Sequence, residues 1–311
     1  MISFGPITSR RLGKSLGINN IPAPKTCSYS CIYCQVGATH NQSATRRNYY
    51  DPEFIFKDVQ HHMELLNESD KPDYLTFVAN GEPALDVNIG RSIALLKTLN
   101  IPVAVITNAS LLSEASVRED LKDADWVSVK IDAGNNALWR AINKPVASLD
   151  FEEVISGVMK FAKMFKGTLM TETMLVRFVN DTTGIFQQIA GIVAQIQPET
   201  AYLSVPTRPP ALKIVQKPDE QAIIEAFQIF SEKISKVELL LGFEGTNIGF
   251  TGNIQSDILS ICAVHPVRED TMEELLRKNK TDRKVLESLI NKKLIKQVSY
   301  HEMNFYVRQF Q

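Results

Sequence analysis

The sequence lacks the features of a membrane or secreted protein. No apolar run approaches the roughly 20 residues that a bilayer-spanning helix needs, and the first 20 residues contain no apolar core of a signal peptide. Cysteine is scarce, with four in 311 residues, so a disulfide framework is excluded as the basis of the fold. We therefore expect a cytoplasmic protein with no membrane partner.

Acidic residues are absent from residues 1–50, although the formal net charge of the whole chain is only −1. This segment contains six basic residues, Arg10, Arg11, Lys14, Lys25, Arg46 and Arg47. Two interpretations are open, and they are compatible. The cations compensate an anionic group held by thiolates nearby, or they attract an anionic substrate or cofactor.

Short β-rich runs alternate with longer helical patterns from residue 50 to about 235. The expected strands are residues 16–21, 73–79, 102–107, 125–131, 168–178 and 202–205. The expected helices between and after them are residues 89–99, 113–122, 151–165, 185–196 and 219–233, and Ser113 is expected to cap the second of these.

Apolar strands separated by helices indicate an α/β protein whose parallel sheet is covered on both faces. Six βα units predict a partial (β/α)6 barrel, an incomplete relative of the eight-unit barrel. A doubly wound open sheet is the structural alternative. Both architectures place their chemistry at the carboxyl ends of the strands.

The pattern changes near residue 250, which predicts a core domain over residues 1–250 and a second domain over 251–311. The second domain is expected to contain helices at 254–264, 270–278 and 281–293, the last capped by Thr281, and β runs at 294–300 and 305–310. Three helices and a hairpin resemble a winged helix-turn-helix. Residues 277–296 carry a local charge of +6, which suits contact with nucleic acid or a solvated helix face.

Three cysteines, Cys27, Cys31 and Cys34, have the spacing C-x3-C-x2-C directly after the first expected strand. Three thiolates on one loop can hold three corners of an iron–sulfur cube and leave the fourth iron open. A structural zinc site is the alternative, but zinc needs a fourth ligand, for which His40 is the nearest candidate. Cys262 lies in an apolar helical stretch and is expected to be a buried thiol.

Tyr33 precedes the third cysteine, and the sequence here resembles the radical S-adenosylmethionine (radical SAM) superfamily, whose hallmark is C-x3-C-x-aromatic-C. The resemblance implies a [4Fe-4S] cluster on the three cysteines, with SAM bound to the open iron. It implies one-electron cleavage of SAM to a 5′-deoxyadenosyl radical, which removes a hydrogen atom from a substrate. An electron donor such as flavodoxin or ferredoxin would be needed, and Tyr33 would lie near the adenine.

The run Asn80-Gly81-Glu82-Pro83 after the second strand resembles the Gly-Gly-Glu-Pro motif of the superfamily, with Asn80 as the departure. The resemblance implies that this backbone edge binds the ammonium group of SAM. Gly81 would allow a close approach and Glu82 would place a negative charge opposite the amino group.

Other polar residues follow the later strands and give weaker candidates. Asn108 is expected to reach the SAM ribose, and Lys130 to neutralise a carboxylate of SAM or of the substrate. The remaining candidates, for which an ordinary turn or ion-pair role is the alternative, are Asp132, Glu172, Arg177 and Arg208. No catalytic residue is assigned.

Within the superfamily, four segments look like the iron–sulfur subgroup of wyosine-type tRNA synthases. They are residues 4–6, 9–13, 205–210 and 242–245. That subgroup holds a second cysteine-ligated cluster, whereas no cysteine precedes Cys27 here. The expectation is a radical SAM oxidoreductase or transferase whose substrate is unassigned, with RNA, a small molecule and a peptide as the candidates. The alternatives are a non-enzymatic iron–sulfur regulator that binds DNA and a zinc-stabilised binding module.

Overall fold

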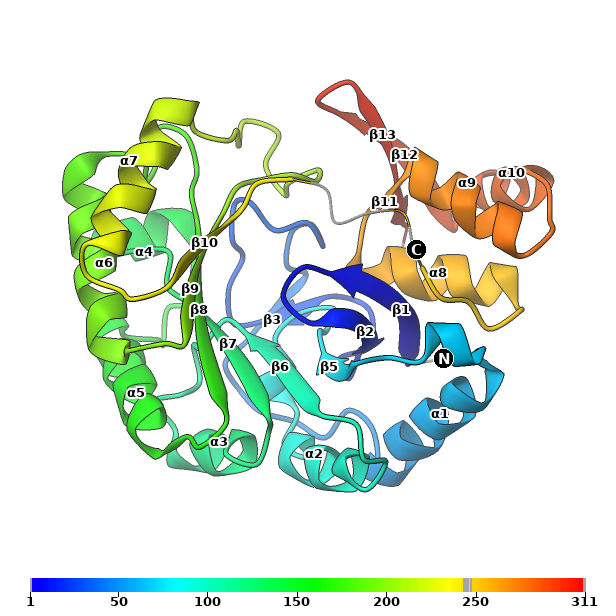
Figure 1. Ribbon diagram of the computed structural model, residues 1–311, viewed down its shortest axis with the longest axis horizontal. Helices are drawn as coiled ribbons and strands as arrows, with labels where there is room; N and C mark the ends of the chain where they lie inside the picture. Colours follow the sequence, from blue (N-terminus) through cyan, green and yellow to red (C-terminus); the bar gives the residue numbers. More distant parts are fainter. Residues whose placement is uncertain (1, 243–245, 247, 310–311) are drawn as a thin grey trace.

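The computed structural model describes residues 2–242, 246 and 248–309. An eight-stranded sheet curls into an incomplete barrel, and helices cover its outer face (Figure 1). The strand order is β1-β2-β5-β6-β7-β8-β9-β10, in which β1 is antiparallel to β2 and all later neighbours are parallel. The expected partial barrel is therefore confirmed.

The strands of this sheet are β1 (Ser3–Ser9), β2 (Gly13–Ile18), β5 (Tyr74–Phe77), β6 (Val103–Thr107), β7 (Trp126–Lys130), β8 (Thr168–Met174), β9 (Thr200–Ser204) and β10 (Val237–Leu240). The helices of the barrel are α1 (Pro52–Leu65), α2 (Ile89–Lys97), α3 (Ala115–Leu121), α4 (Asn136–Ile142), α5 (Phe151–Met164), α6 (Thr183–Ile196) and α7 (Glu220–Ser231). Two short strands, β3 (Thr26–Cys27) and β4 (Asn41–Gln42), pair with each other outside the main sheet.

The middle strands are apolar and fully buried because the helices cover one face and the barrel interior the other. Leu75, Phe77, Val103, Val105 and Val127 have no exposed surface. Burial of each such side chain contributes about 1.5–3 kcal/mol before the entropy of ordering is subtracted. This core holds the strand ends at fixed positions.

Two strands of the main sheet were not predicted. Strand β1 contains Gly5 and Pro6 and its pairing shifts register between Phe4 and Ile7, so it shows no regular alternation. Strand β10 has only four residues, all half-buried at the edge of the sheet. A first strand at 16–21 was placed too late, since β2 runs from Gly13 to Ile18.

Two predicted helix caps are wrong. Helix α3 begins at Ala115, after Glu114, and has no side-chain cap from Ser113. The last helix, α10 (Lys284–Asn291), begins three residues after Thr281, and Asp282 rather than Thr281 accepts from its first N–H group, at 3.0 Å.

The C-terminal unit, residues 251–309 of the described chain, packs beside β1 (Figure 1). It contains α8 (Ile254–Val264), α9 (Glu269–Lys278) and α10, with β11 (Val267–Arg268), β12 (Ile295–Tyr300) and β13 (Met303–Arg308) in the antiparallel order β11-β13-β12. Its apolar core also includes Phe4 of β1 and Ile248. The winged-helix assignment and the boundary at residue 250 stay predictions, and Phe310 lies outside the described residues.

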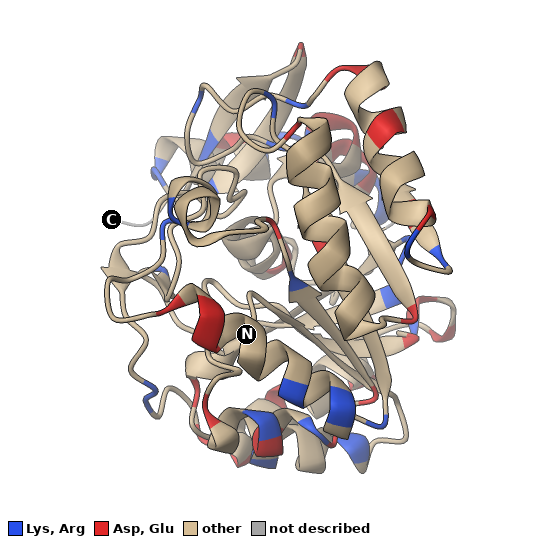
Figure 2. Ribbon diagram, turned by 90° about the vertical axis from the view of Figure 1, so that its left-hand side faces the viewer, with Lys and Arg blue, Asp and Glu red and all other residues tan. Residues whose placement is uncertain are grey.

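Basic and acidic residues are interspersed on the outer helices (Figure 2). In the basic run at 277–296, part of the charge is already balanced, because Arg277 pairs with Glu274 and Arg283 pairs with Glu269. None of the helices in the described part of the chain is long and apolar enough to cross a membrane.

Candidate functional site

The three cysteines lie on a loop at the carboxyl end of the sheet. Cys27 ends β3, whose Thr26 forms a parallel bridge with Gly81 beyond the end of β5. The loop is anchored on the end of α4 by backbone hydrogen bonds, including Ile32 N to Ile142 O at 3.0 Å. The three thiols are free and lie on one short segment, as the spacing predicts.

Each cysteine sulfur accepts a hydrogen bond from an N–H group of a different segment. The three pairs are Asn108 Nδ2 to Cys27 Sγ at 3.5 Å, Asn143 Nδ2 to Cys31 Sγ at 3.4 Å, and Lys25 Nζ to Cys34 Sγ at 3.1 Å. Such donors favour thiolate over thiol and are a known control on the potential of iron–sulfur clusters. Asn143 and Lys25 were not predicted as site residues. Lys25 has a sequence signal, a cation near cysteines, whereas Asn143 has none.

Lys25 is 4% exposed and holds its charge beside the cysteines. Burial alone would lower its pKa, but the charges that Cys34 and Cys27 carry as thiolates raise it overall. The interpretation that a cation compensates the sulfur ligands therefore applies to Lys25. Arg11 and Arg46, from the same acid-free segment, instead pair with Glu172 and Asp120.

The sulfur donors fit an iron–sulfur cluster better than a single metal ion. Within the described residues no three His, Cys, Asp or Glu side chains are grouped as ligands of one metal ion. Cubane thiolates each bind a separate iron and need no such convergence. Burial raises the pKa of Cys27 and of Cys31 to about 12, so these thiols keep their protons until a metal displaces them.

Gly81 joins the cysteine strand to the barrel. Its φ is +140°, and a Cβ at this position would lie 1.7 Å from the backbone oxygen of Thr26. The close approach allows Glu82 N to donate to Thr26 O at 3.2 Å and Thr26 N to donate to Asn80 O at 3.3 Å. Glycine is therefore required here by the position of the cysteine loop, whether or not a cofactor also approaches.

The Glu82 carboxylate is 1% exposed and contacts protein donors. It accepts hydrogen bonds from Thr107 Oγ1 at 2.6 Å, from Asn108 N at 2.7 Å and from Ala84 N at 3.0 Å. Burial raises the pKa of Glu82, and these neutral donors only partly oppose the rise. The side chain thus ties the end of β5 to the end of β6, and its contact with an amino group stays a prediction.

Asn80 stands beside Gly81 with a fully buried side chain. Neither its Nδ2 nor its Oδ1 has a hydrogen-bond partner among the described residues. A buried amide without partners is costly. Because Asn80 stands where the family motif has glycine, an unsatisfied donor and acceptor lie next to the backbone that is expected to bind SAM.

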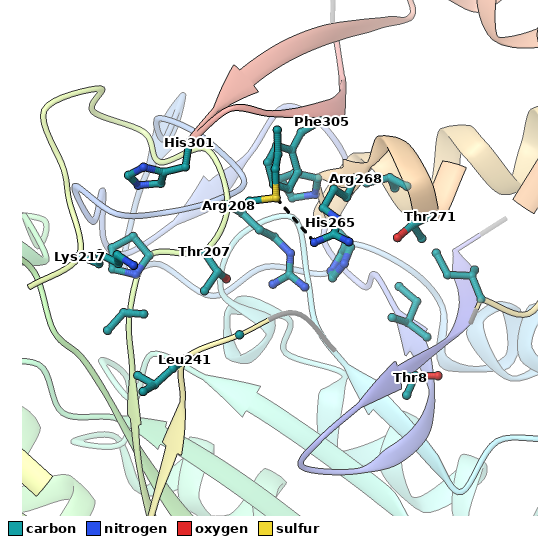
Figure 3. A pocket seen from close by; sticks show the side chains of 18 residues that line it. Thr8, Thr207, Arg208, Lys217, Leu241, His265, Arg268, Thr271, His301 and Phe305 are labelled. Carbon is teal, nitrogen blue, oxygen red and sulfur yellow. Dashed lines mark hydrogen bonds between the residues drawn. The ribbon is translucent and has the colours of Figure 1, made fainter. Parts of the chain in front are cut away.

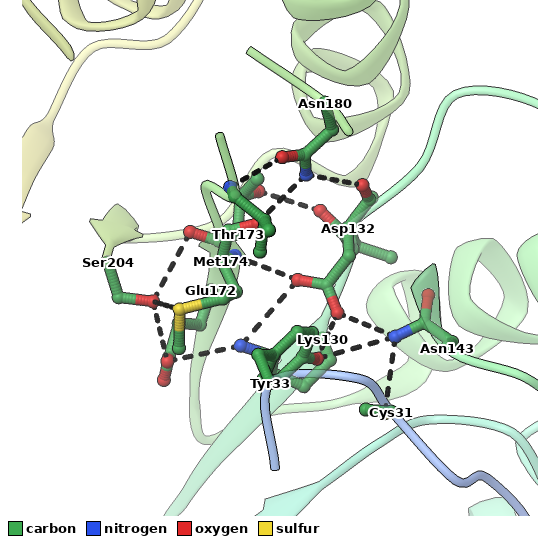
Figure 4. A network of polar contacts seen from close by, with 12 residues as sticks. Cys31, Tyr33, Lys130, Asp132, Asn143, Glu172, Thr173, Met174, Asn180 and Ser204 are labelled. Carbon is green, nitrogen blue, oxygen red and sulfur yellow. Dashed lines mark hydrogen bonds and ion pairs between the residues drawn. The ribbon is translucent and has the colours of Figure 1, made fainter. Parts of the chain in front are cut away.

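A polar network connects the cysteine loop to the carboxyl ends of β7 and β8 (Figure 4). Tyr33 OH donates to Asp132, whose Oδ2 also accepts from Asn143 Nδ2 at 2.7 Å. Lys130 Nζ lies 3.6 Å from Asp132 Oδ1 and 5.1 Å from the centre of the Tyr33 ring. Asn143 contacts both Asp132 and Cys31 and so joins the network to the cysteine loop.

Glu172 forms the other end of this network. Its carboxylate pairs with Lys130 at 3.2 Å and with Arg11, and it accepts from Ser204 Oγ at 3.0 Å. Burial would raise the pKa of Glu172, but the cations of Lys130 and Arg11 lower it to about 2. The charge of Lys130 is thus already paired within the protein. Arg11 and Ser204 were not predicted as site residues.

The remaining candidates are dispersed. The Arg177 guanidinium stacks over the exposed ring of Phe178 at 4.8 Å. Arg208 Nη1 donates to Gln35 Oε1 at 3.2 Å, one residue beyond Cys34. Cys262 is 3% exposed in α8, as expected for a buried thiol. Of the segment 242–245, only Gly242 belongs to the described residues.

Comparison with known proteins agrees with the fold and with the cysteine loop. Residues 21–184 match the Radical SAM superfamily, and the chain therefore belongs to it. A relative, the UPF0026 protein MJ1312 of Methanocaldococcus jannaschii, is 41% identical over 99% of this chain and 96% of its own length. Membership indicates an enzyme and gives no support to a non-enzymatic regulator.

Solved structures with low sequence identity share the fold. TYW1 with a lysine-pyruvate adduct bound has a TM-score of 0.56 and 13% identity, over 72% of this chain and 76% of that one. Streptococcus suis SuiB bound to S-adenosylmethionine has a TM-score of 0.53 and 10% identity, over 73% of this chain and 51% of that one. These similarities support the partial barrel of radical SAM type.

Proposed function

We propose that this protein is a radical SAM enzyme that holds a [4Fe-4S] cluster on Cys27, Cys31 and Cys34. The observation that carries the proposal is the set of three free thiols, each with its own N–H donor, at the carboxyl end of a partial barrel. With SAM bound, the cluster supplies one-electron cleavage of the sulfonium to a 5′-deoxyadenosyl radical that abstracts a hydrogen atom.

The chain's own residues bind and orient the cofactors. The backbone at Gly81 and the buried Asn80 amide are proposed to contact the amino group of SAM, next to Glu82. Asn108 is proposed for the ribose and Tyr33 for the adenine. Lys130, which is already paired with Asp132 and Glu172, is proposed to face the carboxylate of SAM or of the substrate as well. The buried strand ends exclude water from this region.

The proposed partners are SAM, one substrate and a one-electron donor such as flavodoxin or ferredoxin. Within the C-terminal unit, RNA contact is supported only by basic residues that form no ion pair among the described residues, such as Lys292, Lys293 and Lys296. No cysteine precedes Cys27 to hold a second cluster, so we do not assign the wyosine reaction. Free thiols suit a reducing compartment, and we propose the cytoplasm.

The test is anaerobic reconstitution with iron and sulfide, followed by reduction in the presence of SAM. We expect about four irons per chain and release of 5′-deoxyadenosine. Cys31→Ala should abolish both signals, while Cys262→Ala, which removes a thiol buried in α8, should preserve them. Assembly of the cluster in Cys31→Ala, or no 5′-deoxyadenosine from the reconstituted wild type, would overturn the proposal.

A further inference from the structure

Three large apolar side chains, Phe178, Leu212 and Ile214, are exposed on the segments that follow the carboxyl ends of β8 and β9. Phe178 is 84% exposed and Ile214 is 83% exposed. Single exposed apolar residues are normal on a protein surface. These three, however, belong to two segments that contact each other, since Arg177 N donates to Gln216 O at 2.9 Å. We call the three side chains the apolar patch.

The turn that carries Phe178 is held in place by the buried side chain of Asn180 (Figure 4). Its Nδ2 donates to Asp132 O at 3.0 Å and to Met174 O at 2.8 Å. Its Oδ1 accepts from Val176 N at 2.7 Å. The turn gives Phe178 a φ of +61°, in the left-handed region that bulky residues rarely adopt. The fold thus keeps an aromatic ring exposed at a strained position, which is typical of functional segments.

The segment that carries Leu212 and Ile214 contacts the cysteine loop. Leu212 N donates to the backbone oxygen of Ile32, which lies between the second and third cysteines, at 3.0 Å. Val176 and Val215, buried in the same two segments, belong to one apolar cluster with Ile32. A single hydrogen bond therefore separates the apolar patch from the peptide that joins two of the proposed cluster ligands.

The charges beside the apolar patch are all positive. Residues 176–180 and 211–217 contain Arg177, Lys213 and Lys217 and no Asp or Glu. None of these three cations forms an ion pair among the described residues, and the Arg177 guanidinium stacks over the Phe178 ring. Lys217 also lines a cavity between the barrel and the C-terminal unit (Figure 3), so the basic surface continues toward that unit. The patch therefore suits an anionic partner that has an apolar contact face.

The composition of the apolar patch distinguishes between the partners that it can bind. A second copy of this chain would place the same three cations opposite one another in a symmetric interface, and like charges oppose such a contact. RNA would offer phosphates to the cations, but Leu212 and Ile214 are aliphatic and give no ring on which a base can stack. An acidic protein with an apolar contact face matches both the charges and the aliphatic side chains.

We infer that the apolar patch and its three cations bind a small acidic one-electron carrier protein, which delivers an electron to the cysteine loop. This inference rests on the proposed function for the destination of the electron, but the docking surface itself does not. The carrier is oxidised by one electron and the proposed cluster is reduced by one, and no atom passes between the two proteins.

Position and size both suit such a carrier. The contact through Ile32 brings the carrier close to the cysteines, and the rate of electron transfer falls steeply with distance. Complexes of electron carriers bury little surface, below about 1,200 Å². Three apolar side chains with a charged rim are therefore enough to form the contact.

Isothermal titration of the full-length reconstituted protein tests the docking surface, with ferredoxin and flavodoxin as probes. We expect one of these carriers to bind at one site per chain. Its affinity should fall as salt is added, because the contact is partly electrostatic. Binding of neither carrier would overturn the inference.

Two variants locate the bound carrier. Lys213→Glu reverses a charge at an exposed side chain and should weaken binding about tenfold. Phe178→Gly removes the ring and relieves the left-handed φ, so it should weaken binding about threefold without lowering the free energy of unfolding. Lys166→Glu makes the same charge change before β8, at the other end of the strand from Arg177, and should leave binding unchanged. Equal binding in Lys213→Glu and Lys166→Glu would refute the assignment.

A single-stranded RNA oligomer is titrated in parallel. We expect Lys213→Glu and Phe178→Gly to leave its affinity unchanged. Loss of RNA binding in both variants, with carrier binding unchanged, would assign the patch to nucleic acid and overturn the inference.

The release of 5′-deoxyadenosine is measured with dithionite and with the bound carrier as reductants. Dithionite is a small molecule that needs no docking surface, so Lys213→Glu should slow only the reaction driven by the carrier. Carrier binding without release from either reductant would refute the proposed function and keep the docking surface. Release with dithionite by a protein that binds neither carrier would refute the docking surface and keep the function.

Discussion

Two buried glutamates at the carboxyl end of the barrel are held in opposite ways. Glu82, on the side of the cysteines, is surrounded by neutral donors, and its pKa is raised by burial. Glu172, on the side of β7–β9, is paired with two cations, and its pKa falls to about 2 although burial opposes the fall. Glu82 thus connects two strand ends through hydrogen bonds, whereas Glu172 neutralises two cations.

The difference bears on what each side can bind. On the cysteine side the strand ends are joined by backbone contacts and neutral hydrogen bonds, and the buried cation Lys25 contacts a sulfur. A charged cofactor can be added there without breaking an ion pair. On the other side the charges are already matched, so a ligand carboxylate must compete with Glu172 for Lys130.

Gly81→Ala should have the largest effect, because it disrupts the backbone hydrogen bonds that hold Thr26 of β3 against residues 80–82. The new Cβ would meet Thr26 O at 1.7 Å and φ is +140°, so β3 must move. We expect a loss of about 4 kcal/mol in unfolding free energy and poor retention of iron. Chemical denaturation and iron analysis measure both. Gly191→Ala, where no atom lies within 4 Å of the added methyl group, should be neutral or stabilising.

Glu172→Gln should cost about 3 kcal/mol, because it leaves Lys130 and Arg11 beside a neutral group. The folded pKa of about 2 lies below the ordinary 4.5, so the ionised carboxylate stabilises the fold above pH 4.5. The advantage of the wild type over Glu172→Gln should shrink as the pH falls from 4.5 toward 2. Denaturation midpoints measured across this range check it.

The matched change Glu82→Gln sharpens the comparison. Because the folded pKa of Glu82 is raised, its carboxyl group favours the fold most when protonated, and the wild type should lose stability relative to Glu82→Gln as the pH rises. The two variants should therefore show pH dependences of opposite sign. The same sign in both would mean that the two carboxylates are not held differently.

Lys25→Gln should have the smallest effect, on the reduction potential of the proposed cluster. The variant keeps an N–H donor near Cys34 and removes the buried charge, which favours the reduced, more negative state. We expect the equilibrium constant for one-electron reduction to fall about tenfold, or about 59 mV. A redox titration followed by electron paramagnetic resonance measures this. Lys14→Gln, at a half-buried side chain that donates to Ser69 O, should leave the potential unchanged.

The parallel strands and the cysteine loop could be predicted because each depends on a pattern within a short stretch of sequence. Runs such as Val103–Thr107 are apolar throughout, which only a strand covered on both faces tolerates. The spacing of Cys27, Cys31 and Cys34 is likewise local. Strand β10 escaped prediction because an exposed edge leaves no such pattern in four residues.

The surroundings of the cysteines could not be predicted, because they depend on contacts between distant segments. Asn143 is 112 residues from Cys31 and lies after a short helix with no motif. Arg11 is 161 residues from Glu172, and only the curvature of the sheet brings them together. The role of Lys130 was expected to be that of a charge for a ligand, whereas its charge is shared by two carboxylates of the protein.

The apolar core around α8 includes residues from both sides of residue 250. Phe4 and Ile248 pack with Ile258 and Ile261. Separating the C-terminal unit from the barrel would therefore divide a single apolar core. Removing the unit would leave the aromatic ring of β1 facing water and open one wall of the barrel. Phe4 of β1 and the residues of the C-terminal unit thus share one apolar core, although they lie far apart in the described chain.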